Sequence, residues 1–166
     1  MINKIFLTDL HEYNNAELIG DWVHIEEFDR QKHNFGEICR RCGIKKRHGV
    51  FITDYESSFD ISEYIDPETL YRLSDVISSC DDDYIQAVCE YCCDLEEQIK
   101  HCEDEDLEFI PSNDPSYEDL AYSILEETGD LAPDDWKSRY FDYEAFGRDL
   151  VLGGDYTMVS NGYIRR

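Results

Sequence analysis

The amino-acid sequence concentrates negative charge in its central half. From Gly49 to Trp136, 27 carboxylates face only two cations, Arg72 and Lys100, so these 88 residues carry a net charge of −25. Four of the carboxylates stand side by side in the segment HCEDEDLEF at 101–109. Self-repulsion on this scale opposes compact folding. We therefore expect that a requirement other than stability maintains the charge.

The chain nevertheless has enough apolar side chains to bury a core. Hydrophobic residues make up 42% of its 166 residues and aromatic residues 13%, a supply that disordered acidic tails lack. No apolar run approaches the roughly 20 residues that a membrane span needs, and MINKIFLTDLHEY lacks the uninterrupted apolar segment of a signal peptide. The sequence predicts a folded, cytoplasmic protein with no membrane contact.

The seven cysteines are an odd number and accompany no secretion signal. A disulfide framework is therefore the weaker interpretation. We expect mostly reduced thiols, several of them acting as small core residues.

Short runs of apolar and β-favouring residues predict a small α/β module at 1–61. INKIFLTDL, GDWVHIEE and GVFITDY read as three strands. Between the second and third lies a basic stretch at 30–47 that carries seven cations. Phe28, Phe35, Ile38 and Cys42 fit one loose helical face within this region. A three-stranded sheet with one helix is the natural assembly.

Helical periodicity takes over in the middle of the chain. Asp66-Pro67-Glu68 has the order of an N-cap, a first-turn proline and a first-turn acid. From Asp82 onward, an apolar stripe continues to Ile99 and predicts a single helix that turns its carboxylates to water. A further helix is expected from Asp114-Pro115 to a C-terminal stop at Gly129.

The C-terminal part ends with a short helical segment around 143–146 and a hairpin. Asn161-Gly162 is the two-residue turn signal between its two strand-like runs. Together these patterns predict an α+β protein with three modules, an α/β module at 1–61, an acidic helical module at 62–108 and an α+β module at 109–166.

Metal binding is weakly supported by the sequence. Cys39/Cys42 and Cys89/Cys92 are both CxxC pairs, but 46 residues separate them, whereas the pairs of structural zinc sites usually lie within about 12 to 20 residues of each other. The acidic runs lack the central glycine and final glutamate of a calcium loop. We predict no metal and no cofactor, and a Cys/His zinc-binding interaction module remains an alternative.

Catalytic signatures are also missing. There is no glycine-rich phosphate loop, no GxSxG and no HExxH. Carboxylates this abundant make any paired-acid argument uninformative. The sequence predicts a protein that is not an enzyme.

The size of the charge suggests that charge itself is the function. Duplex DNA carries about one phosphate per 1.7 Å, and a compact chain of this length is roughly 40 Å across, a length that holds about 24 phosphates. The net charge of the chain is −24. Such a surface can compete for a DNA-binding groove without reading bases, although an acidic binder of basic peptides would show a similar charge.

Several segments carry a more specific signal in the order and spacing of their residues. They are IFLTDLHEYNNAELIGDWV, with Tyr13, Asn14, Glu17, Leu18, Gly20 and Trp22; ITDYESSF and ISEY; AYSILEETGDL; and YFDYEAFGRDL. In order and spacing, these segments resemble the ArdA antirestriction family, which comprises DNA-mimic proteins encoded on conjugative elements and phages. The basic CRRCGIKKRHG segment and the cysteine-rich stretch at 80–102 depart from the family.

The resemblance implies an elongated, curved chain of three modules that pairs as a homodimer. It implies binding to the DNA groove of the methyltransferase core of Type I restriction-modification enzymes, with restriction and possibly modification blocked and no direct contact with nucleic acid. ILEETGDL overlaps what is called the antirestriction motif in that family. Inhibition of another DNA-binding defence or regulatory protein is the open alternative.

A set of carboxylates on or beside the predicted helices is our candidate partner-binding surface. These phosphate stand-ins are Asp81, Asp82, Asp83, Glu90, Asp94, Glu96, Glu97, Glu103, Asp104, Glu105, Asp106, Glu118, Asp119, Glu126, Glu127, Asp134 and Asp135. We expect Trp22, Tyr143 and Phe146 to lie in the core and Arg148 to form an internal ion pair.

Overall fold

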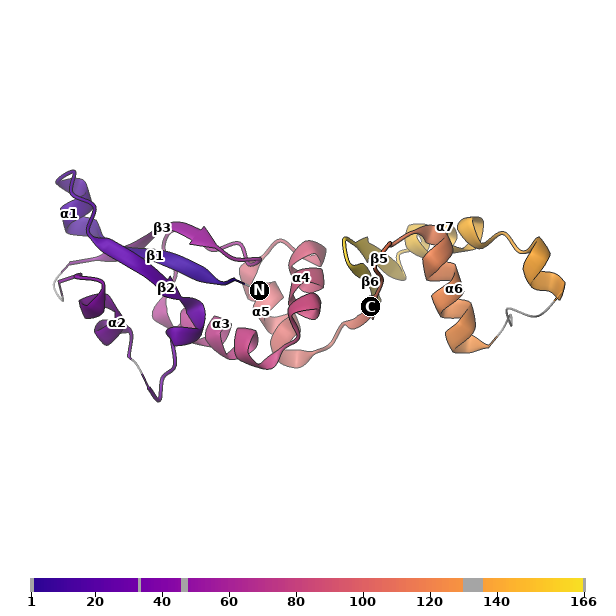
Figure 1. The fold of residues 1–166 in the computed structure, drawn as a ribbon, viewed down its shortest axis with the longest axis horizontal. Helices are drawn as coiled ribbons and strands as arrows, with labels where there is room; N and C mark the ends of the chain where they lie inside the picture. Colours follow the sequence, from indigo (N-terminus) through magenta and orange to yellow (C-terminus); the bar gives the residue numbers. More distant parts are fainter. Residues whose placement is uncertain (1, 33, 46–47, 130–135, 166) are drawn as a thin grey trace.

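The computed structural model describes residues 2–32, 34–45, 48–129 and 136–165. Figure 1 shows an elongated molecule with a sheet at the N-terminal end, α3, α4 and α5 in the middle, and α6 and α7 at the far end. The accessible surface of 9984 Å² exceeds the roughly 8,600 Å² expected for a compact monomer of 19.6 kDa. The predicted elongated α+β architecture is confirmed.

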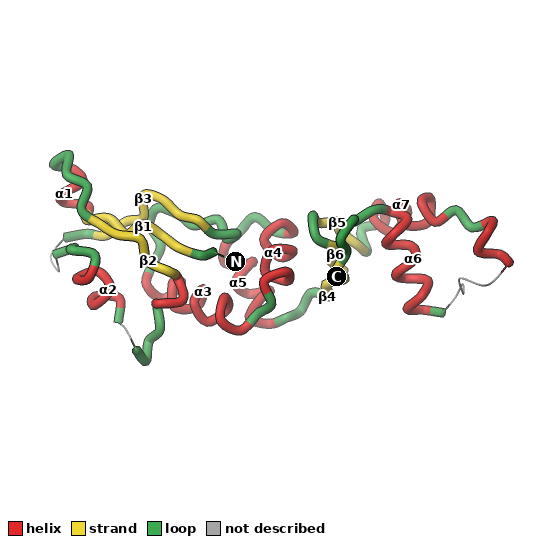
Figure 2. The backbone as a smooth tube through the Cα atoms, in the orientation of Figure 1, coloured by secondary structure: helices red, strands yellow, loops and turns green. Residues whose placement is uncertain are grey.

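The N-terminal part forms a three-stranded antiparallel sheet with strand order β2-β1-β3. Its elements are β1 (Lys4–Asp9), α1 (Leu10–Asn14), β2 (Gly20–His24), a 3-10 helix (Ile25–Glu27), α2 (Phe35–Arg41) and β3 (Val50–Glu56). The three predicted strands and the helix in the basic stretch are all present. Figure 2 shows α2 close to one end of this sheet.

Three helices follow, α3 (Pro67–Ser79), α4 (Asp82–Tyr91) and α5 (Leu95–Asp104). Asp66 caps α3, because its carboxylate accepts from the backbone N–H groups of Glu68 and Thr69. This start agrees with the sequence pattern.

The single helix predicted from Asp82 to about Ile99 is wrong, because the chain breaks between α4 and α5. Cys92 is extended, and the Asp94 carboxylate caps the new helix by accepting from Glu97 N–H at 3.1 Å. The buried Gln98 amide donates to the Cys92 carbonyl at 2.7 Å. These two side chains satisfy backbone groups that a continuous helix would have paired internally.

The C-terminal part packs two helices against a second antiparallel sheet with strand order β4-β6-β5. Its elements are β4 (Glu108–Pro111), α6 (Tyr117–Thr128), a 3-10 helix (Trp136–Tyr140), α7 (Tyr143–Gly153), β5 (Tyr156–Val159) and β6 (Gly162–Arg165). Ser116, rather than Asp114, caps α6 by accepting from Asp119 N–H. Gly129 ends α6 in the left-handed conformation, as predicted.

The predicted C-terminal hairpin is present, but its turn is shifted by one residue. Ser160 and Asn161 form the turn, and Gly162 pairs with Val159 as the first residue of β6. A Cβ atom on Gly162 would lie 2.2 Å from the Ile110 carbonyl oxygen. The glycine is therefore required by the close approach of β4.

Two clusters of buried side chains stabilise the molecule. The larger cluster joins residues on both sides of position 61, such as Ile5 and Leu73, and also reaches Ile164. The smaller cluster contains Leu120, Ile124, Tyr156 and Tyr163. The division at 61/62 and 108/109 stays a prediction.

Three aromatic residues that we expected in the core are only partly buried. Trp22, Tyr143 and Phe146 are all at intermediate exposure. Trp22 packs edge-on against Phe6 at a ring-centroid distance of 5.5 Å. None of the three therefore belongs to a cluster of buried side chains.

Candidate acidic interface

The stand-in carboxylates lie on the surfaces of α4, α5 and α6 and in the segments beside them. All of those in the described part of the chain are exposed except Asp119, which is at intermediate exposure. Asp134 and Asp135 lie outside the described residues. Eleven of the fifteen described stand-ins lie within helices, where backbone hydrogen bonds fix the positions of their Cα atoms, and Asp81, Asp94, Glu105 and Asp106 lie just outside.

Two of the acids are also helix caps. The Asp81 carboxylate accepts from the backbone N–H of Asp83 at 2.9 Å, and Asp94 does the same for Glu97. An acid at a helix N-terminus is stabilised by the helix dipole. These two carboxylates therefore serve the fold while remaining exposed.

Arg72 on α3 holds two carboxylates of α5. Its guanidinium donates to both carboxylate oxygens of Glu103 at 2.8 Å and to Glu96 at 2.6 Å. Glu96 and Glu103 are seven residues apart and so lie on one face of α5, two turns from each other. The hydrogen bonds from Arg72 hold the pKa of Glu103 below its usual value, against a smaller opposing effect of burial. Arg72 thus neutralises part of the acidic surface.

Glu90 ties α4 to the C-terminal hairpin. One carboxylate oxygen accepts from the backbone N–H of Ser160 at 2.7 Å, and the other accepts from the Ser160 hydroxyl. Burial raises the pKa of Glu90, but the bonds from Ser160 and Gln86 outweigh it and the net shift is downward. The Asn161 amide also donates to the Asp83 carbonyl at 2.9 Å.

The acidic run at 103–106 lies where α5 ends. Glu105 adopts a left-handed conformation with φ 46°, which turns the chain out of the helix. The Asp106 carboxylate lies 2.6 Å from the His101 imidazole nitrogen. The helix dipole disfavours carboxylates at a helix C-terminus, so Glu103 and Asp104 do not stabilise α5 through the dipole.

Helix α6 carries acids at both of its ends. Glu118 and Asp119 lie in the first turn, where the dipole favours them, and Glu126 and Glu127 lie in the last turn, where it does not. Asp119 accepts from the Tyr163 hydroxyl at 3.0 Å. Burial, together with this carboxylate, raises the pKa of Tyr163 to about 12. Asp119 is thus partly a structural residue.

Few cations offset this surface. Among the described residues, Arg72 forms ion pairs with two of the stand-ins, Glu96 and Glu103. Arg148 is exposed, and no carboxylate in the described ranges pairs with it. The internal ion pair that we expected for Arg148 is therefore absent from this part of the chain.

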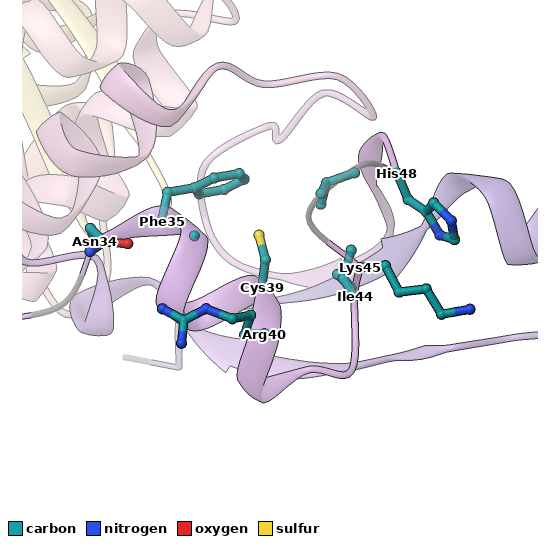
Figure 3. A pocket seen from close by; sticks show the side chains of 9 residues that line it. Asn34, Phe35, Cys39, Arg40, Ile44, Lys45 and His48 are labelled. Atoms are coloured by element: carbon teal, nitrogen blue, oxygen red, sulfur yellow. The ribbon is translucent and has the colours of Figure 1, made fainter.

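The five described cations of the basic stretch are engaged with neighbouring acids. Arg41 pairs with Glu27 at 2.6 Å, Lys45 pairs with Glu12 at 2.6 Å, and Arg30 pairs with Glu68. Beside them is a cavity of about 310 Å³ (Figure 3), with Asn34 and Phe35 at one end and Lys45 and His48 at the other. The part of the basic stretch at 30–45 that the structure describes is thus locally neutralised.

The cysteines do not form a zinc site in the described part of the chain. All seven are free thiols, and Cys39, Cys42, Cys92 and Cys102 are buried. Burial raises the pKa of Cys39 and of Cys92 to about 11. Metal ligation requires the thiolate, which burial disfavours here. None of these thiols belongs to a cluster of metal-ligating atoms among the described residues.

Three structural roles were not predicted from the sequence. They are the pairing of Arg72 with two carboxylates of α5, the bonds of Glu90 to the hairpin turn, and the bond of Tyr163 to Asp119. Each links positions more than 20 residues apart. The isolation of Arg72 among acids was the one sequence signal for such a role.

Comparison with known proteins identifies the family of the chain. The family model of the antirestriction protein ArdA matches residues 5–165. A search of curated proteins returned no match. Within the described residues, every helix is too short or too polar to cross a membrane. Because the family model spans nearly the whole chain, the chain belongs to the ArdA antirestriction family, whose members are inhibitors rather than enzymes.

Proposed function

We propose that this ArdA family member is a cytoplasmic DNA mimic that occupies the DNA-binding groove of a Type I restriction-modification enzyme. The stand-in carboxylates would take the place of backbone phosphates in the methyltransferase core, so that restriction is blocked. The observation that carries the proposal is the acidic surface of α4, α5 and α6, whose carboxylates are exposed with the exception of the half-exposed Asp119 and of which Arg72 engages two, Glu96 and Glu103.

The density of charge on α5 supports this function. The ten-residue helix is about 15 Å long, a length over which duplex DNA carries about nine phosphates. The helix itself carries four carboxylates, at positions 96, 97, 103 and 104, and the residues next to its ends carry three more, at 94, 105 and 106. The helix alone thus reaches about half the linear charge density of duplex DNA, which suits a groove that binds phosphates mainly through charge.

Apolar side chains at the C-terminal end support a homodimer. Trp136, Tyr140 and Leu152 are 69%, 83% and 74% exposed, and Tyr122 stacks on Tyr143 with ring centroids 4.0 Å apart. Contiguous exposed apolar surface marks protein interfaces, and Trp136 and Tyr140 lie together with ring centroids 6.4 Å apart. We propose that a second copy covers it. Sedimentation equilibrium should give twice the chain mass, and a monomer at micromolar concentration would exclude this assembly.

The direct test is competition between the protein and duplex DNA for a purified Type I methyltransferase core. We expect displacement of the DNA by the protein, with an affinity that falls steeply as salt rises, because exposed charges are screened. Binding that does not depend on salt, or no displacement, would contradict the proposal. Displacement from an unrelated DNA-binding protein but not from the core would favour the alternative partner.

Matched charge variants locate the surface. The triple variant Glu97→Gln, Asp104→Asn and Glu127→Gln should weaken displacement by at least about tenfold if each contact contributes about 0.5–1 kcal/mol. The control Glu17→Gln, Glu26→Gln and Glu63→Gln removes the same charge from exposed positions in the N-terminal part. An equal loss of DNA displacement in both variants would mean that binding depends on net charge and not on where the carboxylates lie.

A further inference from the structure

A cluster of metal-ligating side chains lies in the N-terminal part, away from the acidic helices. His11, Glu12 and His48 each offer one ligand atom, and these atoms all lie within 4.8 Å of one another. His11 and Glu12 are on α1, whereas His48 lies just before β3. The two imidazole rings lie face to face at a tilt of 38°, with centroids 4.4 Å apart. The fold therefore brings the imidazole of His48 beside the adjacent residues His11 and Glu12, which lie 37 and 36 residues earlier in the sequence.

A buried carboxylate orients one of the imidazoles. Asp9 is fully buried, and its oxygens lie 2.7 and 2.8 Å from Nδ1 of His48. Asp9 also accepts from the backbone N–H groups of His11, Glu12 and Lys45. With Nδ1 of His48 engaged by Asp9, and 4.0 Å from Oε1 of Glu12, Nε2 is the ring nitrogen left to ligate an ion. A histidine held by a carboxylate in this way is the usual arrangement behind a metal-ligating imidazole.

A cation already occupies part of this cluster. Lys45 Nζ lies 2.6 Å from Oε1 of Glu12, and Figure 3 shows the Lys45 and His48 side chains at the same end of the cavity. The local geometry therefore accepts positive charge. A metal ion would have to displace the Lys45 ammonium from Glu12.

We propose that His11, Glu12 and His48 bind a divalent transition-metal ion of the zinc class, with Asp9 orienting His48. Two imidazoles and one carboxylate suit zinc and its neighbours, whereas calcium and magnesium prefer oxygen ligands alone. Ligand distances of about 2.0–2.2 Å require the three ligand atoms to close to about 3.3 Å from one another. His11 is exposed and can rotate to achieve this. The bound ion would cross-link α1 to the chain entering β3.

Cobalt absorption and zinc calorimetry test the site on the full-length protein. We expect one equivalent of Co²⁺ with visible d–d bands and without sulfur-to-cobalt charge-transfer absorption, which separates this site from the thiols. His11→Gln should weaken binding at least tenfold, as should His48→Gln, since loss of an outer partner alone typically costs 10–100-fold. His24→Gln, which changes an exposed histidine outside the cluster, should bind as the unmodified protein does.

The zinc affinity of Lys45→Met distinguishes a metal site from a structural cluster most clearly, because the Lys45 ammonium competes with the metal for Glu12. Zinc affinity should rise in this variant, whereas a merely structural role of the histidines predicts no gain. Absence of bound metal, a thiolate spectrum, or binding that His11→Gln leaves unchanged would each overturn the proposal. None of these outcomes depends on inhibition of a restriction enzyme.

Discussion

The Glu90 carboxylate on α4 accepts a hydrogen bond from the backbone N–H of Ser160, in the turn of the C-terminal hairpin, at 2.7 Å. Seventy residues separate the two in sequence. Gln86 donates to the Ser160 hydroxyl at 3.0 Å, and Asn161 bonds the Asp83 carbonyl. The middle helices and the C-terminal sheet are thus joined by polar contacts to one turn, which fixes how their acidic surfaces are placed relative to each other.

Replacing Glu90 should loosen this joint. Glu90→Ala removes a charge-assisted acceptor that is partly exposed, so we expect a loss of about 1 kcal/mol in the free energy of unfolding by urea. Glu97→Gln, on the exposed side of α5, should change it by less than about 0.5 kcal/mol. Equal effects in the two variants would show that the contact with Ser160 is not stabilising.

Replacing Arg72 should lower the stability of the protein without lowering its inhibition of the enzyme. In Arg72→Gln, Glu96 and Glu103 lose their shared cation, and we expect destabilisation by about 1 kcal/mol because the network is largely exposed. The acidic surface becomes more negative, so inhibition of a Type I enzyme should be retained or increased. Lys100→Gln makes the same change in charge without breaking a described ion pair. Loss of inhibition in Arg72→Gln alone would argue that the clamp positions the contacts.

The Arg72 clamp also predicts a pH dependence. Arg72 holds the pKa of Glu103 below its ordinary value of 4.5. A lowered pKa in the folded state gives stability that is present above the ordinary value and lost as pH falls through the folded one. The stability difference between the unmodified protein and Arg72→Gln should therefore be constant above about pH 4.5 and shrink below it. A difference that persists unchanged at about pH 3 would exclude this linkage.

Two glycines of α7 form a matched pair for testing the packing of α6 and α7. A Cβ atom on Gly147 would lie 1.8 Å from the Tyr117 carbonyl oxygen, whereas one on Gly153 would meet its nearest atom at 3.8 Å. Gly147→Ala should destabilise the protein by about 2–3 kcal/mol in thermal unfolding. Gly153→Ala should be neutral or stabilising by up to about 1 kcal/mol. Similar midpoints for both variants would rule out close packing at Gly147.

Local patterns sufficed for most of the secondary structure. The Asp66-Pro67 start, the Gly129 stop and the three N-terminal strands all depend on residues adjacent in sequence, and all are present. The break between α4 and α5 was missed because the apolar stripe continues across it. The bonds of the Gln98 amide to the Cys89 and Cys92 carbonyls and the Asp94 cap accompany that break, and the apolar periodicity does not contain them.

The candidate surface was predictable in kind but not in detail. Exposure of the helical carboxylates followed from amphipathic spacing. Which of them are engaged by Arg72, Ser160 or Tyr163 depends on how separate elements pack, and a single sequence does not encode that in any local pattern. The grouping of His11 with His48 was missed for the same reason.

The elongated outline has a consequence for how the protein is handled. A rod diffuses more slowly than a sphere of equal mass, so this chain should leave a size-exclusion column earlier than its mass of 19.6 kDa implies. A single copy would then elute like a larger globular protein and be mistaken for a pair. Light scattering weighs the eluting particle without regard to its outline.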